Sequence, residues 1–162
     1  MVASDSPFID AAGMSSTRRH FLILAALTAL FALRVAAQAT QRWHAFPFLP
    51  PFDAFQGSAL PYELLLSAQI AILAAMVWLA LKVRVEALQR RAGIGRALAI
   101  AGWSYCAVML IRLCIGAAVP AAPHWFKAWI PSVFHMVLAL FVLALAAYHR
   151  QSRAVSADAG TT

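Results

Sequence analysis

Charged side chains are scarce in this chain. They make up 12% of its 162 residues, whereas an average soluble domain contains about 25%. Hydrophobic residues account for 63% of the chain, and the mean hydropathy is +0.76. A single soluble domain of this length cannot bury so much apolar surface. The composition therefore predicts an integral membrane protein.

Cysteine, glycine and proline are also few, and the common enzyme motifs are missing. The chain has 2 cysteines, 7 glycines and 8 prolines, which excludes a disulfide scaffold, a collagen and a Gly/Pro-rich low-complexity chain. No Walker loop, GxGxxG, CxxC or HExxH spacing occurs, and no serine lies in a nucleophile elbow. We therefore predict neither a catalytic residue nor a metal site, and we expect the chain not to be an enzyme on its own.

Four long hydrophobic stretches dominate the sequence. They cover residues 21–40, 62–81, 97–119 and 128–148. Each has about 20 residues, which at 1.5 Å per residue spans the roughly 30 Å hydrocarbon core of a bilayer. None has the continuous polar stripe of a helix in a soluble bundle. The predicted fold is all-α: a polytopic membrane protein with four transmembrane helices within residues 17–150, between disordered tails at 1–16 and 151–162.

The basic residues predict the orientation. Nine of them lie at helix ends that share one side of the membrane: Arg18, Arg19, Lys82, Arg84, Arg90, Arg91, Arg96, Arg150 and Arg153. The loops on the other side contain only Arg42 and Lys127. By the positive-inside rule, both termini and the central loop are cytoplasmic. The net charge of +7 thus reflects topology, and we expect a multi-pass inner-membrane protein without a nucleic-acid partner.

One short segment permits a different interpretation of the first helix. Residues 17–22, Thr-Arg-Arg-His-Phe-Leu, resemble a twin-arginine export signal, and Ala37-Gln38-Ala39 resembles a signal-peptidase site. Cleavage there would leave three helices in the mature chain. A pair of arginines before a first membrane helix is, however, what the positive-inside topology requires anyway. We therefore expect the first helix to remain as an anchor.

Polar side chains gather in the outer third of the predicted bilayer. Counted at 1.5 Å per residue, six of them fall near the outer ends of the four helices: Arg34, Gln38, Glu63, Gln69, Arg112 and His135. Tyr105 shares a helix face with Arg112. A charged group within hydrocarbon costs about 2.5–3.5 kcal/mol, so its presence needs a reason. These seven residues form the candidate ligand site.

Two interpretations of this cluster are open. In the structural one, Glu63 neutralises one arginine, while Gln69 and His135 form hydrogen bonds with the other. In the functional one, two arginines against one glutamate form a pocket for an anionic or carbonyl-bearing ligand, such as a lipid headgroup, a carboxylate or a quinone. The aromatic, proline-containing loops 41–61 and 120–127 then act either as an interfacial belt or as a lid over the pocket.

The preferred function is a non-enzymatic accessory or ligand-binding membrane subunit, associated with another membrane protein or with a second copy. The alternative is a redox anchor that binds quinone or haem b, in which the ring oxygens or the iron are held by Arg112, Tyr105, Gln69 and His135. Haem is considered because His135 and His149 are 14 residues apart on one helix. Haem would need a facing histidine, which the other helices lack inside the bilayer. A small transporter is a third class, although no helix is clearly broken at mid-membrane.

Overall fold

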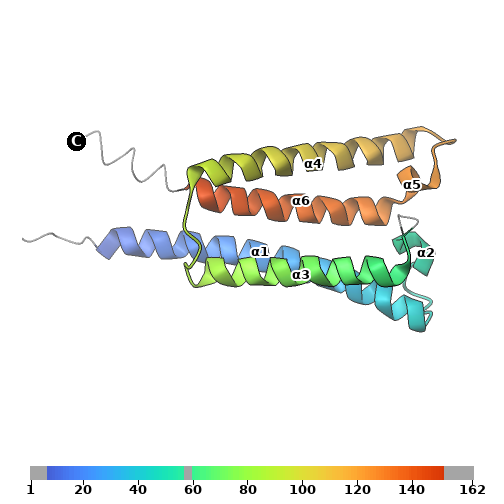
Figure 1. Ribbon diagram of the computed structural model, residues 1–162, viewed down its shortest axis with the longest axis horizontal. Helices are drawn as coiled ribbons and strands as arrows, with labels where there is room; N and C mark the ends of the chain where they lie inside the picture. Colours follow the sequence, from blue (N-terminus) through green and yellow to red (C-terminus); the bar gives the residue numbers. More distant parts are fainter. Residues whose placement is uncertain (1–6, 57–59, 152–162) are drawn as a thin grey trace, which may run out of the picture.

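The described part of the chain consists of helices and their connections. The structure, a computed structural model, describes residues 7–56 and 60–151 (Figure 1). The helices are α1 (Pro7–Trp43), α2 (Phe52–Phe55), α3 (Tyr62–Arg84), α4 (Ala92–Ala118), α5 (His124–Lys127) and α6 (Trp129–Arg150). No strand occurs within those residues.

Four of these helices are long and apolar enough to cross a membrane. The spanning parts are Ser16–Trp43, Tyr62–Arg84, Ala92–Ala118 and Trp129–Arg150. The predicted all-α fold with four transmembrane helices is therefore confirmed, whereas its orientation stays a prediction. α1 begins at Pro7, inside the segment predicted to be a disordered tail. The other parts of the predicted tails, residues 1–6 and 152–162, lie outside the described residues.

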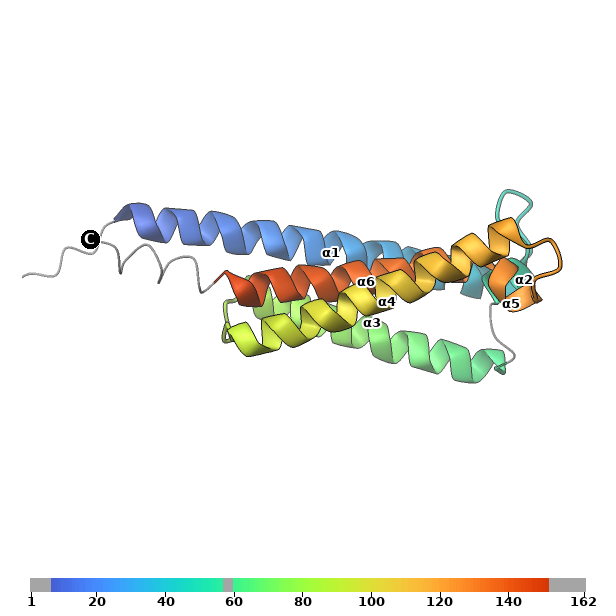
Figure 2. The same ribbon diagram turned by 90° about the horizontal axis from the view of Figure 1, so that it is seen from above.

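The long helices run back and forth between two different ends of the bundle (Figures 1 and 2). α2 and α5 lie at one end, which we call the short-helix end. The start of α1, the α3–α4 loop and the end of α6 lie at the other, which we call the terminal end. α6 packs against both α1 and α4, and α3 packs against α1. The bundle thus consists of an α1–α3 pair and an α4–α6 pair that meet through α1 and α6.

Small residues bring α4 and α6 into close contact. Gly95 and Gly102, seven residues apart on α4, are both buried. A Cβ at Gly102 would lie 2.8 Å from a leucine side chain of α6, and 3.4 Å from the carbonyl oxygen of Ala139. A Cβ at Gly95 would lie 3.1 Å from the carbonyl oxygen of Ala146. Close approach at small residues gives transmembrane helices the van der Waals contact that holds them together.

The apolar core lies among α1, α3 and α6. Its buried members include Leu24 and Phe31 of α1, Val83 of α3, and Phe141 and Tyr148 of α6. This core would lose one wall if α1 were removed as a cleaved signal. Toward the short-helix end, α3 diverges from α4 and α6 (Figure 2). Arg34, Gln69, Arg112 and His135 gather at this end of the bundle.

Candidate functional site

A cavity of about 160 Å³ lies inside the bundle near the short-helix end. Four polar side chains line it, one from each long helix: Arg34 of α1, Gln69 of α3, Arg112 of α4 and His135 of α6. The rest of the lining is apolar and includes four aromatic residues: Phe31, Phe55, Trp125 and Phe134. Phe55 belongs to α2 and Trp125 to α5. Both short helices therefore border the cavity.

Arg34 connects α1 to the first short helix. Its side chain is 6% exposed, and Nη2 donates a 2.9 Å hydrogen bond to the carbonyl oxygen of Phe55, the last residue of α2. Carbonyl groups at the end of a helix have no partner within that helix. Nε of Arg34 is buried without a hydrogen-bond partner among the described residues. The guanidinium thus holds α2 in place and keeps an unused donor.

Arg112 has the same role for the second short helix. Its side chain is 4% exposed, and Nε and Nη2 both donate to the carbonyl oxygen of Trp125, over 3.1 and 2.5 Å. Cζ of Arg112 also lies 3.9 Å from the centroid of the Trp125 ring, which is within the range of a cation–π interaction. Each buried arginine therefore anchors one short helix beside the cavity.

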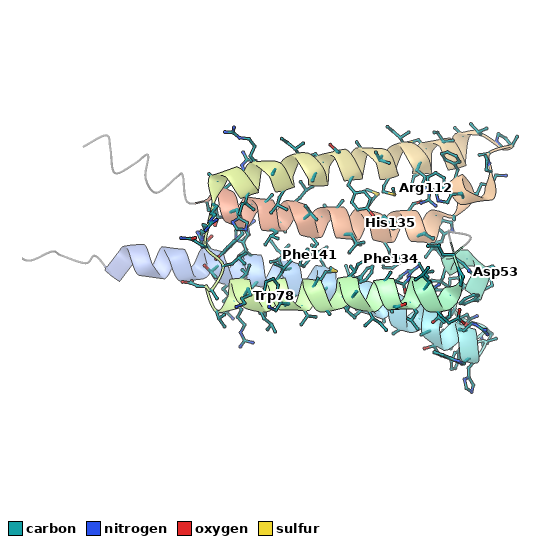
Figure 3. All side chains as sticks on the ribbon, viewed as in Figure 1. Asp53, Trp78, Arg112, Phe134, His135 and Phe141 are labelled. Carbon is teal, nitrogen blue, oxygen red and sulfur yellow. The ribbon has the colours of Figure 1, made fainter. Side chains whose placement is uncertain are left out.

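Two further hydrogen bonds join neighbouring helices around the cavity. Nε2 of Gln69 donates to Oε1 of Gln38 over 3.2 Å, which links α3 to α1. The hydroxyl of Tyr105 and Nδ1 of His135 share a 2.6 Å hydrogen bond, which links α4 to α6. His135 lies between α4 and α6, whereas Phe134 points toward the α1–α3 pair (Figure 3). Within the described chain, Nε2 of Gln38 and Oε1 of Gln69 are buried without a partner.

The structure brings together six of the seven candidate residues. Four line the cavity, and Gln38 and Tyr105 are the hydrogen-bond partners of two that do. The sequence pattern missed the acceptors of both arginines, because these are backbone carbonyls rather than side chains. Phe55 and Trp125 belong to the two aromatic loops of the sequence. Their place beside the cavity agrees with the lid interpretation of those loops.

Glu63 is the residue that lies elsewhere. It is exposed at the start of α3, in shallow surface grooves that it shares with Arg42. Neither Arg34 nor Arg112 forms an ion pair with any described residue. The structural interpretation, in which Glu63 neutralises one of them, is therefore wrong. Gln69 and His135 form their hydrogen bonds with Gln38 and Tyr105 rather than with the other arginine. Six residues separate Glu63 from Gln69, which is about 1.7 helical turns, so the two side chains leave α3 in different directions.

Haem does not fit this site within one chain. His149 is about 21 Å along α6 from His135 at 1.5 Å per residue, and its Nδ1 accepts a 3.2 Å hydrogen bond from the backbone N–H of Arg91 at the terminal end. His20 of α1 also lies at that end, with its ring against Tyr148. No group of three or more His, Cys, Asp or Glu side chains that could hold a metal ion occurs among the described residues.

No protein-family model, curated protein or solved structure significantly matches this chain. Its function therefore has to be inferred from the chemistry of the cavity.

Proposed function

We propose that this chain is a non-enzymatic, ligand-binding subunit of the cell inner membrane, acting with another membrane protein or a second copy. Its cavity receives the oxygen-bearing head of a lipid-soluble ligand. The proposal is carried by Arg34 and Arg112, which are buried without an acidic partner among the described residues. Arginine stays charged in proteins. Backbone carbonyls use part of its hydrogen-bonding capacity, and ligand oxygens would use the rest.

The size of the cavity and its access restrict the ligand. Its volume of about 160 Å³ is close to that of an engineered cavity of about 150 Å³ that binds benzene. It therefore admits one ring-sized group, while any longer tail stays outside. Two lining residues, Ala68 and Ile72 of α3, are exposed on the side of the bundle. Because that side faces hydrocarbon in a membrane, the ligand enters from the bilayer rather than from water.

A quinone is the ligand class favoured by the cavity walls, which keeps the redox anchor as a second candidate. Phe31 and Phe134 line the cavity, and the donors of Arg34 and Arg112 come from α1 and α4, which both pack against α6. A quinone head is a flat ring with two carbonyl oxygens, which suits aromatic walls with a few placed donors. The long helices are unbroken, which gives no support to the transporter alternative.

We expect the purified protein to bind decylubiquinone, and both Gln69→Leu and His135→Phe to weaken that binding about fivefold. Each change removes a polar group that lines the cavity but holds neither short helix. Loss of one hydrogen bond costs about 1 kcal/mol, and 1.4 kcal/mol corresponds to a tenfold change in affinity. Titration calorimetry in a mild detergent measures the dissociation constants.

Glu63→Gln is the matched control for this experiment, because Glu63 is polar, exposed and outside the cavity. Its affinity for decylubiquinone should equal that of the wild type. Decanoate serves as a second probe with a carboxylate head. If decanoate binds and decylubiquinone does not, the ligand is a carboxylate and the redox candidate fails. If neither probe binds, the ligand-binding proposal fails as a whole.

The charges of the two ends support the proposed orientation. Eight described basic residues lie at or near the terminal end: Arg18, Arg19, Lys82, Arg84, Arg90, Arg91, Arg96 and Arg150. The short-helix end has Arg42 and Lys127, besides the two buried arginines. By the positive-inside rule, the terminal end faces the cytoplasm and the cavity lies in the outer part of the bilayer.

Cysteine labelling tests this orientation. In a variant with Cys106 and Cys114 replaced by alanine, we expect Ala45→Cys to react with an impermeant maleimide added outside the inner membrane. Gln89→Cys should react only after that membrane is permeabilised. Both positions are exposed, Ala45 in the loop after α1 and Gln89 in the loop before α4. Labelling in the opposite sense would place the terminal end on the outer side of the inner membrane.

A further inference from the structure

A second concave site lies on the outside of the α4–α6 pair near the terminal end. It has a volume of about 560 Å³ and is lined by one face of α4, from Ala92 to Ser104, and by Arg150 at the end of α6. We call it the α4 groove. It shares no lining residue with the cavity at the short-helix end. It is therefore a separate candidate site.

Two arginines form the polar part of the α4 groove. Arg96 and Arg150 are exposed, and neither forms a hydrogen bond, a ring contact or an ion pair with a described residue. Other arginines at this end are engaged: Nη2 of Arg90, for example, donates to Oγ1 of Thr17 over 3.0 Å. The lining of the groove thus has two positive charges and, among the described residues, no acid to balance them.

Gly95 explains why both arginines reach the same groove. The stem of Arg150 lies against α4 at this glycine, and a Cβ there would be 2.9 Å from Cγ of Arg150. Because Gly95 has no side chain, the side chain of Arg150 crosses α4 at this point. It reaches the face of α4 that contains Arg96, which directly follows Gly95 in the sequence. The guanidinium groups complement an anion with several oxygens, such as a phosphate.

The rest of the α4 groove leads from these charges toward the middle of the membrane. Trp103 is seven residues beyond Arg96, or about 10 Å along the helix axis. Ile100 lies between them, and the two apolar side chains are 64% and 65% exposed. Tryptophan is favoured near the boundary between headgroups and acyl chains. Charge at one end and an apolar trough below it match the shape of a phospholipid.

We propose that the α4 groove binds an anionic phospholipid, with its phosphate at Arg96 and Arg150 and an acyl chain along Ile100 and Trp103. Basic pockets beside transmembrane helices bind anionic headgroups in this way. The apolar trough distinguishes a phospholipid from free phosphate, which has nothing to place there. The site lies in the leaflet at the terminal end, whichever way that end faces.

Native mass spectrometry of the full chain with phosphatidylglycerol and phosphatidylcholine tests the proposal. We expect the wild type to prefer phosphatidylglycerol at least tenfold. The double variant Arg96→Gln/Arg150→Gln should bind it about 25-fold more weakly, or about fivefold for each arginine near the membrane surface. The matched control is Arg18→Gln/Arg19→Gln, which removes the same charge at the same end but outside the groove. Its affinity should stay within about twofold of the wild type.

Three outcomes would overturn the proposal. Equal losses in the two double variants would show that the lipid responds only to the net charge of the terminal end. If the wild type does not prefer phosphatidylglycerol, the groove is not a site for anionic lipid. If an equal concentration of inorganic phosphate displaces the lipid, the occupant is free phosphate.

Fluorescence quenching by brominated phosphatidylglycerol provides an independent measurement on wild-type protein. Trp103→Phe should remove the most strongly quenched component, and unchanged quenching would place the acyl chain elsewhere.

Discussion

The Gly116→Ala substitution is expected to destabilise the folded protein by about 3 kcal/mol, at the upper end of the usual cost of overpacking. A Cβ at Gly116 would overlap the carbonyl oxygen of Phe126, and would lie 2.8 Å from the carbon of that carbonyl. These are backbone atoms of α5, so no change of rotamer relieves the overlap. α5 would have to move away from α4, which would also separate Arg112 from its acceptor, the carbonyl of Trp125.

Thermal unfolding in detergent, followed by circular dichroism, measures this effect. A loss of about 3 kcal/mol corresponds to a fall in Tm of about 6–12 °C for a chain of this length. Gly93→Ala is the matched control, because it makes the same change in the same helix where nothing lies within 4 Å. It should be neutral or raise stability by up to about 1 kcal/mol through helix propensity. Equal effects of the two variants would show that α5 does not rest on α4 at Gly116.

The long helices could be predicted from the sequence because a membrane leaves the backbone few options. Each hydrophobic stretch must satisfy its own backbone groups in hydrocarbon, and a helix is the way to do so within one segment. The same argument says nothing about α2 and α5, which have four residues each. Their positions depend on hydrogen bonds from Arg34 and Arg112. Such tertiary contacts cannot be derived from local propensity.

Only part of the candidate site could be derived from depth in the membrane. Residues at one depth on four helices can meet only if their side chains also point inward, and residue spacing from a helix end gives depth but not rotation. Gln69 and His135 satisfy both conditions. Glu63 comes close in depth but leaves α3 on another face. The α4 groove was missed for a related reason, since it depends on the path of Arg150 past Gly95.

Arg112→Lys is expected to cost about 2–5 kcal/mol, although the positive charge is kept. Lysine has no planar fork with which to donate twice to the Trp125 carbonyl, and one hydrogen bond from a charged group contributes about 1.5–3 kcal/mol. The stacking of the guanidinium on the Trp125 ring is also lost, and contributes about 0.5–2 kcal/mol. Thermal unfolding in detergent should show a lower Tm, and proteolysis in the 120–127 loop should become faster as α5 loosens.

Glu63→Gln should leave the Tm unchanged, because Glu63 is exposed and pairs with neither buried arginine. Were Glu63 the counter-ion of Arg112, as one version of the structural interpretation would have it, its loss would leave a buried cation unpaired, and breaking such a pair costs about 3–5 kcal/mol. The two variants therefore separate two descriptions of the same polar cluster. If Arg112→Lys destabilises and Glu63→Gln does not, the buried charge is held by backbone carbonyls, which leave it without a neutralising acid. If instead Glu63→Gln destabilises and Arg112→Lys does not, Glu63 is the counter-ion of Arg112. The physical basis for a ligand with anionic or carbonyl oxygens would then be lost.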